Sequence, residues 1–184
     1  MSKNKIMNRI KKLVCVMFGG LVAACSGNYP PLEVVDKVDI EKYLGRWYEI
    51  ARLPNSFEEG CFCVTAEYSV IDSTTIRVTN SCKEDSTLGE LNQANGKAFV
   101  VEGSNNAKLR VQFFWPFRGD YWIIELDKEN YLYALVGSPS REYLWILCRT
   151  SKMDQSIYNM LVEKAKAKGF DVSKLHLTNQ ECEE

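Results

Sequence analysis

The chain has 184 residues, of which 23 are basic and 24 acidic. Five of the basic residues and none of the acidic ones precede residue 13, so residues 25–184 hold 18 basic and 24 acidic side chains, a net charge of −6. This acidic balance argues against a nucleic-acid-binding surface and against a polybasic membrane patch, and the length fits about one domain.

Residues 1–24 have the pattern of an export signal. A basic segment precedes an apolar run over residues 13–24, which is shorter than the ~20 residues needed to cross a bilayer. The run ends in Val22-Ala23-Ala24 directly before Cys25, which resembles a bacterial lipobox. That resemblance implies a lipoprotein signal peptide and a Cys25 that carries lipid on its sulfur and becomes the acylated N-terminus. With Ser26 next, it also favours the outer membrane; an ordinary secretory signal with an incidental cysteine is the alternative.

A short tether over residues 25–37, which includes two prolines, leads to the body of the protein. Asp39 can cap a helical turn over residues 40–44, and Gly45 can end this turn with a positive φ. Trp47 then lies at the start of the first strand, where a bulky indole suits the closure of one end of a barrel. An ordinary core tryptophan is the alternative.

Most of the body reads as strands of five to ten residues joined by short turns, many of them rich in Gly, Ser, Asn and Asp. Regular hairpins in this order predict an all-β, up-and-down antiparallel sheet of eight strands, whose edges are best removed by closure into a barrel. The interior of an eight-stranded barrel is either packed shut or holds one small ligand. The predicted strands are 46–53, 65–71, 75–79, 95–101, 108–113, 121–126, 131–136 and 143–149.

One amphipathic helix follows the strands. Either Ser151 or Asp154 can cap its start, and Gly169 ends it. A single such helix after an all-β body must pack its apolar stripe against the outside of the barrel. The stripe consists of Ile157, Met160, Leu161 and Ala165.

Together these features resemble the lipocalin family. The run from Gly45 through Trp47 to Glu49 matches the first family signature, and residues 143–150 resemble the third, whereas the second is kept only in part at residues 126–128. The resemblance implies a lipocalin domain over residues 38–184 in which Arg149 stacks on Trp47 at the closed end, a contact of about 0.5–2 kcal/mol. With the lipobox upstream, the likeness is closest to the bacterial outer-membrane lipoproteins of this family, which are related to apolipoprotein D.

Five cysteines remain after Cys15 leaves with the signal and Cys25 takes the lipid, and export beyond the cytosol permits disulfides. The resemblance to apolipoprotein D implies a Cys63–Cys182 bond. A second pairing, Cys61–Cys82, is open because a hairpin that turns near residues 72–74 brings these residues close together. Cys148 would then be a free thiol that faces outward beneath the helix. Metal binding by Cys61-x-Cys63 is not expected, because a second clustered cysteine pair and histidine partners are missing. No other cofactor is expected.

The open end of the barrel is expected at the strand tips opposite Trp47 and Arg149. Residues 113–122 are too aromatic for a solvated turn, so their rings either cap a filled core or line the mouth of an apolar cavity. Arg118 is either a solvated loop residue or a rim residue that pairs with a carboxylate or phosphate head group. The candidate ligand-binding residues are Phe57, Leu109, Val111, Phe113, Phe117, Arg118, Tyr121, Trp122 and Trp145.

The resemblance implies a carrier or store of lysophospholipid or fatty acid for envelope maintenance. It would be held at the outer membrane through Cys25, facing the periplasm, with a homodimer left open. No enzyme is expected, because the sequence has no Gly-x-Ser-x-Gly elbow, no His-Glu-x-x-His motif and no phosphate-binding Gly loop, and its one histidine, His176, lies in the tail. Two alternatives stay open: an isomerase-like enzyme that uses Glu49, Glu67 or Glu125, and a protein-binding module that uses the open-end loops.

Overall fold

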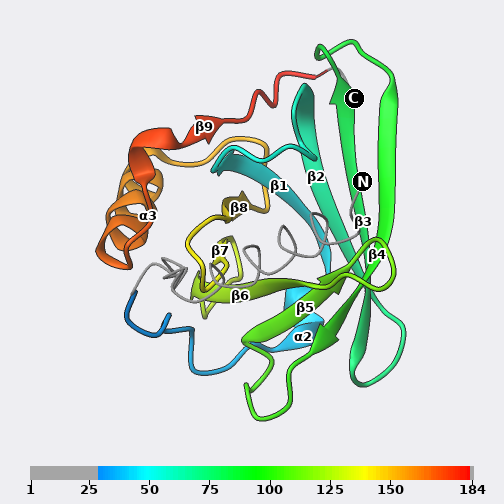
Figure 1. Cartoon of the computed structure of the whole chain (residues 1–184). Coiled ribbons are helices and arrows are strands. Elements are labelled where there is room, and N and C mark those ends of the chain that lie inside the picture. The colour runs from blue at the N-terminus through cyan, green and yellow to red at the C-terminus, as the bar shows by residue number, and fades with distance from the viewer. Residues whose placement is uncertain (1–28, 183–184) are drawn as a thin grey trace, which may run out of the picture.

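The structure of the chain is a computed structural model that describes residues 29–182 (Figure 1). The predicted signal peptide over residues 1–24 and the predicted acylation of Cys25 lie outside the described residues. The elements are α2 (Ile40–Tyr43), β1 (Gly45–Arg52), β2 (Cys61–Val70), β3 (Thr75–Glu84), β4 (Leu91–Val100), β5 (Lys108–Gln112), β6 (Gly119–Leu126), β7 (Tyr133–Gly137), β8 (Leu144–Cys148), α3 (Gln155–Ala167), η1 (Val172–Lys174) and β9 (His176–Leu177).

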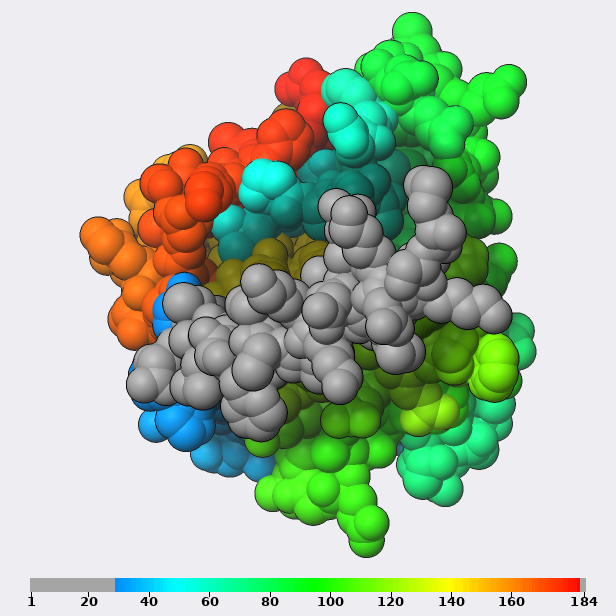
Figure 2. Space-filling view, viewed as in Figure 1, coloured from blue at the N-terminus to red at the C-terminus, as the bar shows by residue number. Residues whose placement is uncertain are grey.

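Strands β1 to β8 form an antiparallel sheet that closes on itself. Each strand from β2 to β7 pairs with the next one along the chain, and β1 pairs with β8 on one side and with β2 on the other. Helix α3 lies outside the sheet, at the left in Figure 1 and in orange in the same view in Figure 2, and β9 is a short extra strand beside β1. The prediction of an eight-stranded up-and-down barrel with one helix outside it is confirmed.

Helix α2 and a single glycine bring the chain into β1. The Asp39 carboxylate accepts hydrogen bonds from the backbone N–H groups of Glu41 and Lys42, which caps the turn. Gly45 then has a φ of +84°, a left-handed conformation that favours glycine over residues with a Cβ atom. The chain therefore turns sharply, so that Trp47 enters the barrel at its base.

Two apolar clusters lie on opposite faces of the barrel wall. Leu147 of β8 joins the inner cluster together with Trp47. Its neighbour Ile146 points the other way and packs with Leu161 and Ala165 of α3 in the outer cluster. Because successive side chains of a strand alternate between its faces, β8 supplies both clusters. The same strand thus forms part of the barrel core on its inner face and packs against helix α3 on its outer face.

Asp154 caps helix α3. Its carboxylate accepts hydrogen bonds from the backbone N–H groups of Ser156 (2.8 Å) and Ile157 (3.4 Å). Of the two caps that the sequence allows, the structure uses Asp154, not Ser151. The buried residues of α3 are Leu161 and Ala165, so the predicted apolar stripe faces the barrel.

The C-terminal segment fills a seam between β1 and β2. These two strands pair only over residues 45–48 of β1, toward the base. Farther along, Ala51 and Arg52 of β1 pair with β9 instead, and the backbone N–H of Cys63 in β2 donates to the carbonyl of Asn179 (2.8 Å). The side chain of Gln180 donates to carbonyls of both strands, at Glu49 and Val64 (2.8 Å each). The tail is therefore part of the barrel wall.

Candidate ligand-binding site

Arg149 and Trp47 close the base of the barrel. The guanidinium carbon of Arg149 lies 3.9 Å from the centre of the Trp47 ring. Its three nitrogen atoms donate to the carbonyls of Tyr131 (3.2 Å), Arg46 (2.8 Å) and Lys42 (2.7 Å). One side chain thus joins three segments of the closed end, and the loops at the other tips of the strands form the open end.

Three tyrosine hydroxyls meet inside the barrel above this base. The Tyr121 oxygen lies 2.8 Å from the Tyr43 oxygen and 2.9 Å from the Tyr68 oxygen. Burial raises the pKa of all three phenols, that of Tyr68 to about 12. The group is therefore neutral and polar within an apolar interior. Only Tyr121 was a sequence candidate, because the meeting point depends on the barrel closure that brings β2 and β6 opposite each other.

The predicted wall residues of β5 face the interior. Leu109 is fully buried in the inner cluster, whereas Val111 and Phe113, nearer the open end, are only half-buried against it. Trp145 on β8 is likewise half-buried against this cluster. Gly96 makes room for Phe113, because a Cβ atom at Gly96 would lie 2.8 Å from the phenylalanine ring. Along β5 and β8, the burial of the inward-facing apolar side chains thus decreases from the base to the mouth.

Trp122 does not line the interior, and this prediction is wrong. It packs with the outer cluster, and the Lys108 ammonium lies 4.2 Å from its ring centre. Its neighbours Tyr121 and Ile123 belong to the inner cluster. Adjacent residues of a regular strand point to opposite faces, so Tyr121 and Trp122 cannot both face the interior of the barrel.

Arg118 and Phe117 are exposed in the loop between β5 and β6, so neither lines the interior of the barrel. The Arg118 guanidinium lies 4.0 Å from the ring centre of Phe99, whose neighbours Ala98 and Val100 take part in the inner cluster. Phe99 therefore points outward, and Arg118 packs on the outside of the wall. Phe117 keeps 77% of its surface exposed, so it belongs to the rim. Sequence alternation does not extend into a loop, where these two residues lie.

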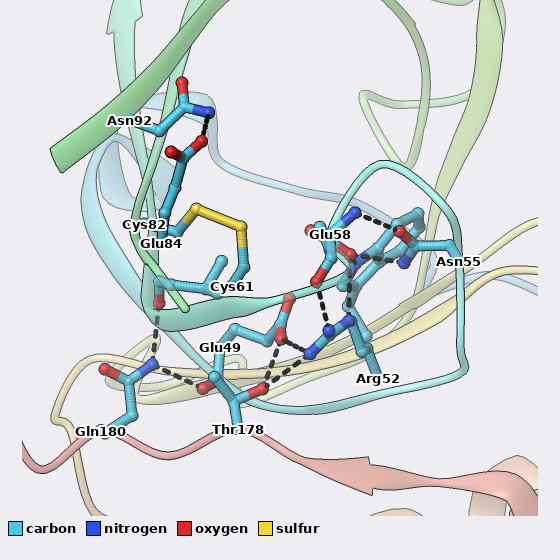
Figure 3. Close-up of a disulfide and its surroundings, with 12 residues drawn as sticks. Glu49, Arg52, Asn55, Glu58, Cys61, Cys82, Glu84, Asn92, Thr178 and Gln180 are labelled. Atoms are coloured by element: carbon cyan, nitrogen blue, oxygen red, sulfur yellow. Dashed lines mark hydrogen bonds and ion pairs between the residues drawn. A yellow bond between two sulfur atoms is a disulfide. The ribbon is translucent and has the colours of Figure 1, made fainter. Parts of the chain in front are cut away.

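Glu49, Arg52, Glu58 and Thr178 form a buried polar cluster near the mouth (Figure 3). Sequence analysis did not predict this cluster. Arg52 lies between two carboxylates: its Nη1 atom is 3.0 Å from Glu49 and its Nε atom is 3.4 Å from Glu58. The Trp145 indole donates to Glu58 (3.2 Å), and the Thr178 hydroxyl donates to Glu49. Burial, and next the charge of Glu58, raise the pKa of Glu49 to about 8, although Thr178 and Arg52 oppose this shift. One guanidinium does not neutralise two carboxylates here.

A β-bulge explains why this cluster escaped sequence analysis. The pairing of β1 with β8 shifts register between Glu49 and Ala51. The extra residue brings Arg52 to the face of Glu49, which regular alternation would not do. Of the residues in this cluster, only Glu49 was a sequence candidate for acid–base chemistry. The other two candidates lie elsewhere: Glu67 is exposed beside Arg46, and Glu125 pairs with Lys164 of the outer helix (2.8 Å).

Two disulfides hold the mouth and the tail. Cys61 bonds to Cys82 and Cys63 bonds to Cys182, with Cα–Cα distances of 5.4 Å and 6.2 Å. Cys148 is a buried free thiol. Within residues 29–182, no group of three or more His, Cys, Asp or Glu side chains is arranged to hold a metal ion.

Phe57 and the β1–β2 loop complete the rim. The Phe57 side chain is 62% exposed, and its ring centre lies 5.9 Å from that of Tyr143 and 6.5 Å from that of Trp145. A pocket of about 560 Å³ lies between this loop and β9, with Arg52, Asn55 and His176 among its lining residues. The rim is therefore aromatic on one side and polar on the other.

Comparison with known proteins identifies the family. A family model described as a lipocalin-like domain matches residues 38–180. The chain belongs to the lipocalin family. This lipocalin is 40% identical to the outer membrane lipoprotein Blc of Vibrio cholerae, over 94% of this chain and all of that protein. It is 44% identical to Blc of Escherichia coli K12, over 84% of this chain and 87% of that protein, and 39% identical to apolipoprotein D of Mus musculus, over 84% and 83%.

Solved structures agree on the fold of this lipocalin. Insecticyanin from the tobacco hornworm superposes with a TM-score of 0.66 at 21% identity, over 83% of this chain and 86% of that one. Apocrustacyanin C2 gives a TM-score of 0.63, also at 21% identity, over 77% of this chain and 79% of that one. None of the helices in the described part of the chain combines the length and the apolar character that a membrane-spanning helix needs.

Proposed function

We propose that this lipocalin binds one amphiphilic lipid, a lysophospholipid or a fatty acid, and carries or stores it at the outer membrane, to which acylated Cys25 attaches it on the periplasmic side. The observation that carries the proposal is the change of burial among the inward-facing apolar side chains of β5 and β8. Leu109 is fully buried near the base, whereas Val111, Phe113 and Trp145 are only half-buried toward the mouth. Such a wall suits an acyl chain that enters from the open end.

The polar cluster supports a head group at the mouth. Glu49, Arg52 and Glu58 lie on the same inner side as Trp145, near the rim. A lipid that inserts its chain first leaves its polar end beside these charges. The names of the similar bacterial lipoproteins support the outer-membrane location, and none of the quoted relatives is named as an enzyme.

Calorimetric titration with lysophospholipids and fatty acids of increasing chain length tests the proposal. Each methylene group removed from water contributes ~0.8 kcal/mol, so the affinity should rise about fourfold for each added carbon until the cavity is full. Binding should be stoichiometric and without turnover. An affinity that does not depend on chain length would contradict the proposal, and release of a chemically altered lipid would favour the enzyme alternative.

A further inference from the structure

Exposed aromatic side chains are concentrated at the open end of the barrel. Phe114, Trp115 and Phe117, in the loop between β5 and β6, expose 78%, 86% and 77% of their surface. Phe57 in the β1–β2 loop exposes 62%, and Tyr143 at the start of β8 exposes 38%. The large exposed apolar residues near the closed end, among those that the structure describes, are aliphatic: Val70, Ile71 and Leu132. Exposed rings of this density mark an interaction surface.

The described chain also begins at this end. The carbonyl of Pro30 accepts a hydrogen bond from the Arg141 side chain (2.8 Å), and the Arg141 guanidinium lies 5.2 Å from the centre of the Tyr29 ring. Arg141 belongs to the loop between β7 and β8, which is an open-end loop. Cys25 precedes Tyr29 by four residues, which span at most about 14 Å when fully extended. A lipid on Cys25 therefore starts close to the open rim.

We propose that the open rim docks on the surface of a lipid bilayer, with the side chains of Phe114, Trp115 and Phe117 inserted among the head groups. This rests on the acylation of Cys25, which is part of the proposed function. Aromatic rings favour the boundary between head groups and acyl chains. The acidic body is not attracted to anionic lipid, so the contact must be apolar and insensitive to salt. Cargo could then pass between membrane and mouth without crossing water.

Fluorescence quenching by lipid tests this orientation. The mature acylated protein is reconstituted into phosphatidylcholine vesicles with and without bromine-labelled phosphatidylcholine, after mass spectrometry of the acyl groups. The bromine-labelled lipid should quench the tryptophan emission of the wild-type protein more than that of the Trp115→Phe variant. This difference should persist in high salt. Leu132→Trp, which adds a reporter to the closed-end loop between β6 and β7, is the matched control and should add only unquenched emission.

Three results would overturn the docking. They are equal quenching of wild type and Trp115→Phe, quenching of the added tryptophan in Leu132→Trp, and a mature chain without acyl groups. A fourth is a dimer that dissociates on Phe114→Ser/Trp115→Ser/Phe117→Ser substitution while Trp115 stays unquenched, since the rim would then bind a second copy. Titration of each variant with lysophospholipid separates the two proposals. If the protein binds lysophospholipid but Trp115 stays unquenched, only the docking proposal is rejected. If the wild-type protein binds no lipid, the carrier function is rejected.

Discussion

Arg149, directly after β8, covers the face of Trp47, near the start of β1, at 3.9 Å, so the two signature residues meet where the barrel closes. Arg149→Ala removes this contact and three hydrogen bonds to carbonyls, and should lower the free energy of unfolding by about 2–3 kcal/mol. Trp47→Ala should cost about 3–5 kcal/mol, because it leaves a cavity in the core. Urea titration measures both. Arg149→Lys should recover less than half of the loss, since lysine cannot reach three carbonyls from one planar group.

Arg46→Ala is the control for the closed end. Arg46 is exposed and lies 3.7 Å from the exposed Glu67, so its removal should change stability by less than about 1 kcal/mol. A loss as large as that of Arg149→Ala would show that general charge, not the closure of the base, determines stability.

Trp145 and Trp122 test which face of the wall holds the ligand. Trp145→Ala should weaken lipid binding at least about tenfold, because a large half-buried inner side chain is lost. Trp122→Ala removes an equal indole from the outer cluster, and should lower stability while leaving the affinity unchanged. Calorimetry and thermal unfolding of both variants give the comparison. Equal losses of affinity in two folded variants would contradict an interior site.

Glu49 should make stability depend on pH. Its pKa is raised to about 8 by burial and by Glu58, above the ordinary value of 4.5. The folded protein thus keeps a proton that the unfolded chain releases near pH 4.5. The stability from this proton is fully present below pH 4.5 and is lost as the pH rises to about 8, at most about 1.4 kcal/mol for each pH unit.

Thermal unfolding between pH 5 and pH 9 measures this dependence. Glu49→Gln, which cannot release a proton, should flatten the fall in melting temperature below pH 8. Glu67→Gln on the exposed outer face is the matched substitution, and it should keep the wild-type profile. A wild-type protein whose stability does not fall over this range would mean that Arg52 holds Glu49 ionised.

The two disulfides should differ in their contribution. Cys63–Cys182 links residues 119 positions apart, and Cys61–Cys82 links residues 21 apart. In the chain-entropy model these loops are worth about 5 and about 3 kcal/mol. Cys63→Ser/Cys182→Ser should therefore destabilise the protein more than Cys61→Ser/Cys82→Ser in urea titration. The reverse order would mean that the tail contributes little to the wall.

The fold and the closed end could be predicted from the sequence because their signals are local. Gly45 and Trp47 mark the entry to β1, alternation marks the wall, and the spacing from Ile157 to Ala165 marks the outer helix. The mouth could not be predicted as well. Arg52 reaches the polar cluster only through a bulge, and Arg118 lies in a loop whose path no periodicity describes. The tyrosine group could not be predicted either, because Tyr43, Tyr68 and Tyr121 are far apart in sequence and only the closure of the barrel brings their hydroxyls together.

Because residues 176–180 fill the seam between β1 and β2, this segment is a structural part of the barrel wall. A protein cut before His176 would expose unpaired backbone on two neighbouring strands, which is the kind of edge that recruits other chains into aggregates. The β3–β4 turn over residues 85–90 is mostly exposed and leaves more latitude for engineering. Residues 176–182 should be left intact, and any purification handle should be placed where it cannot pull this segment away from its neighbours.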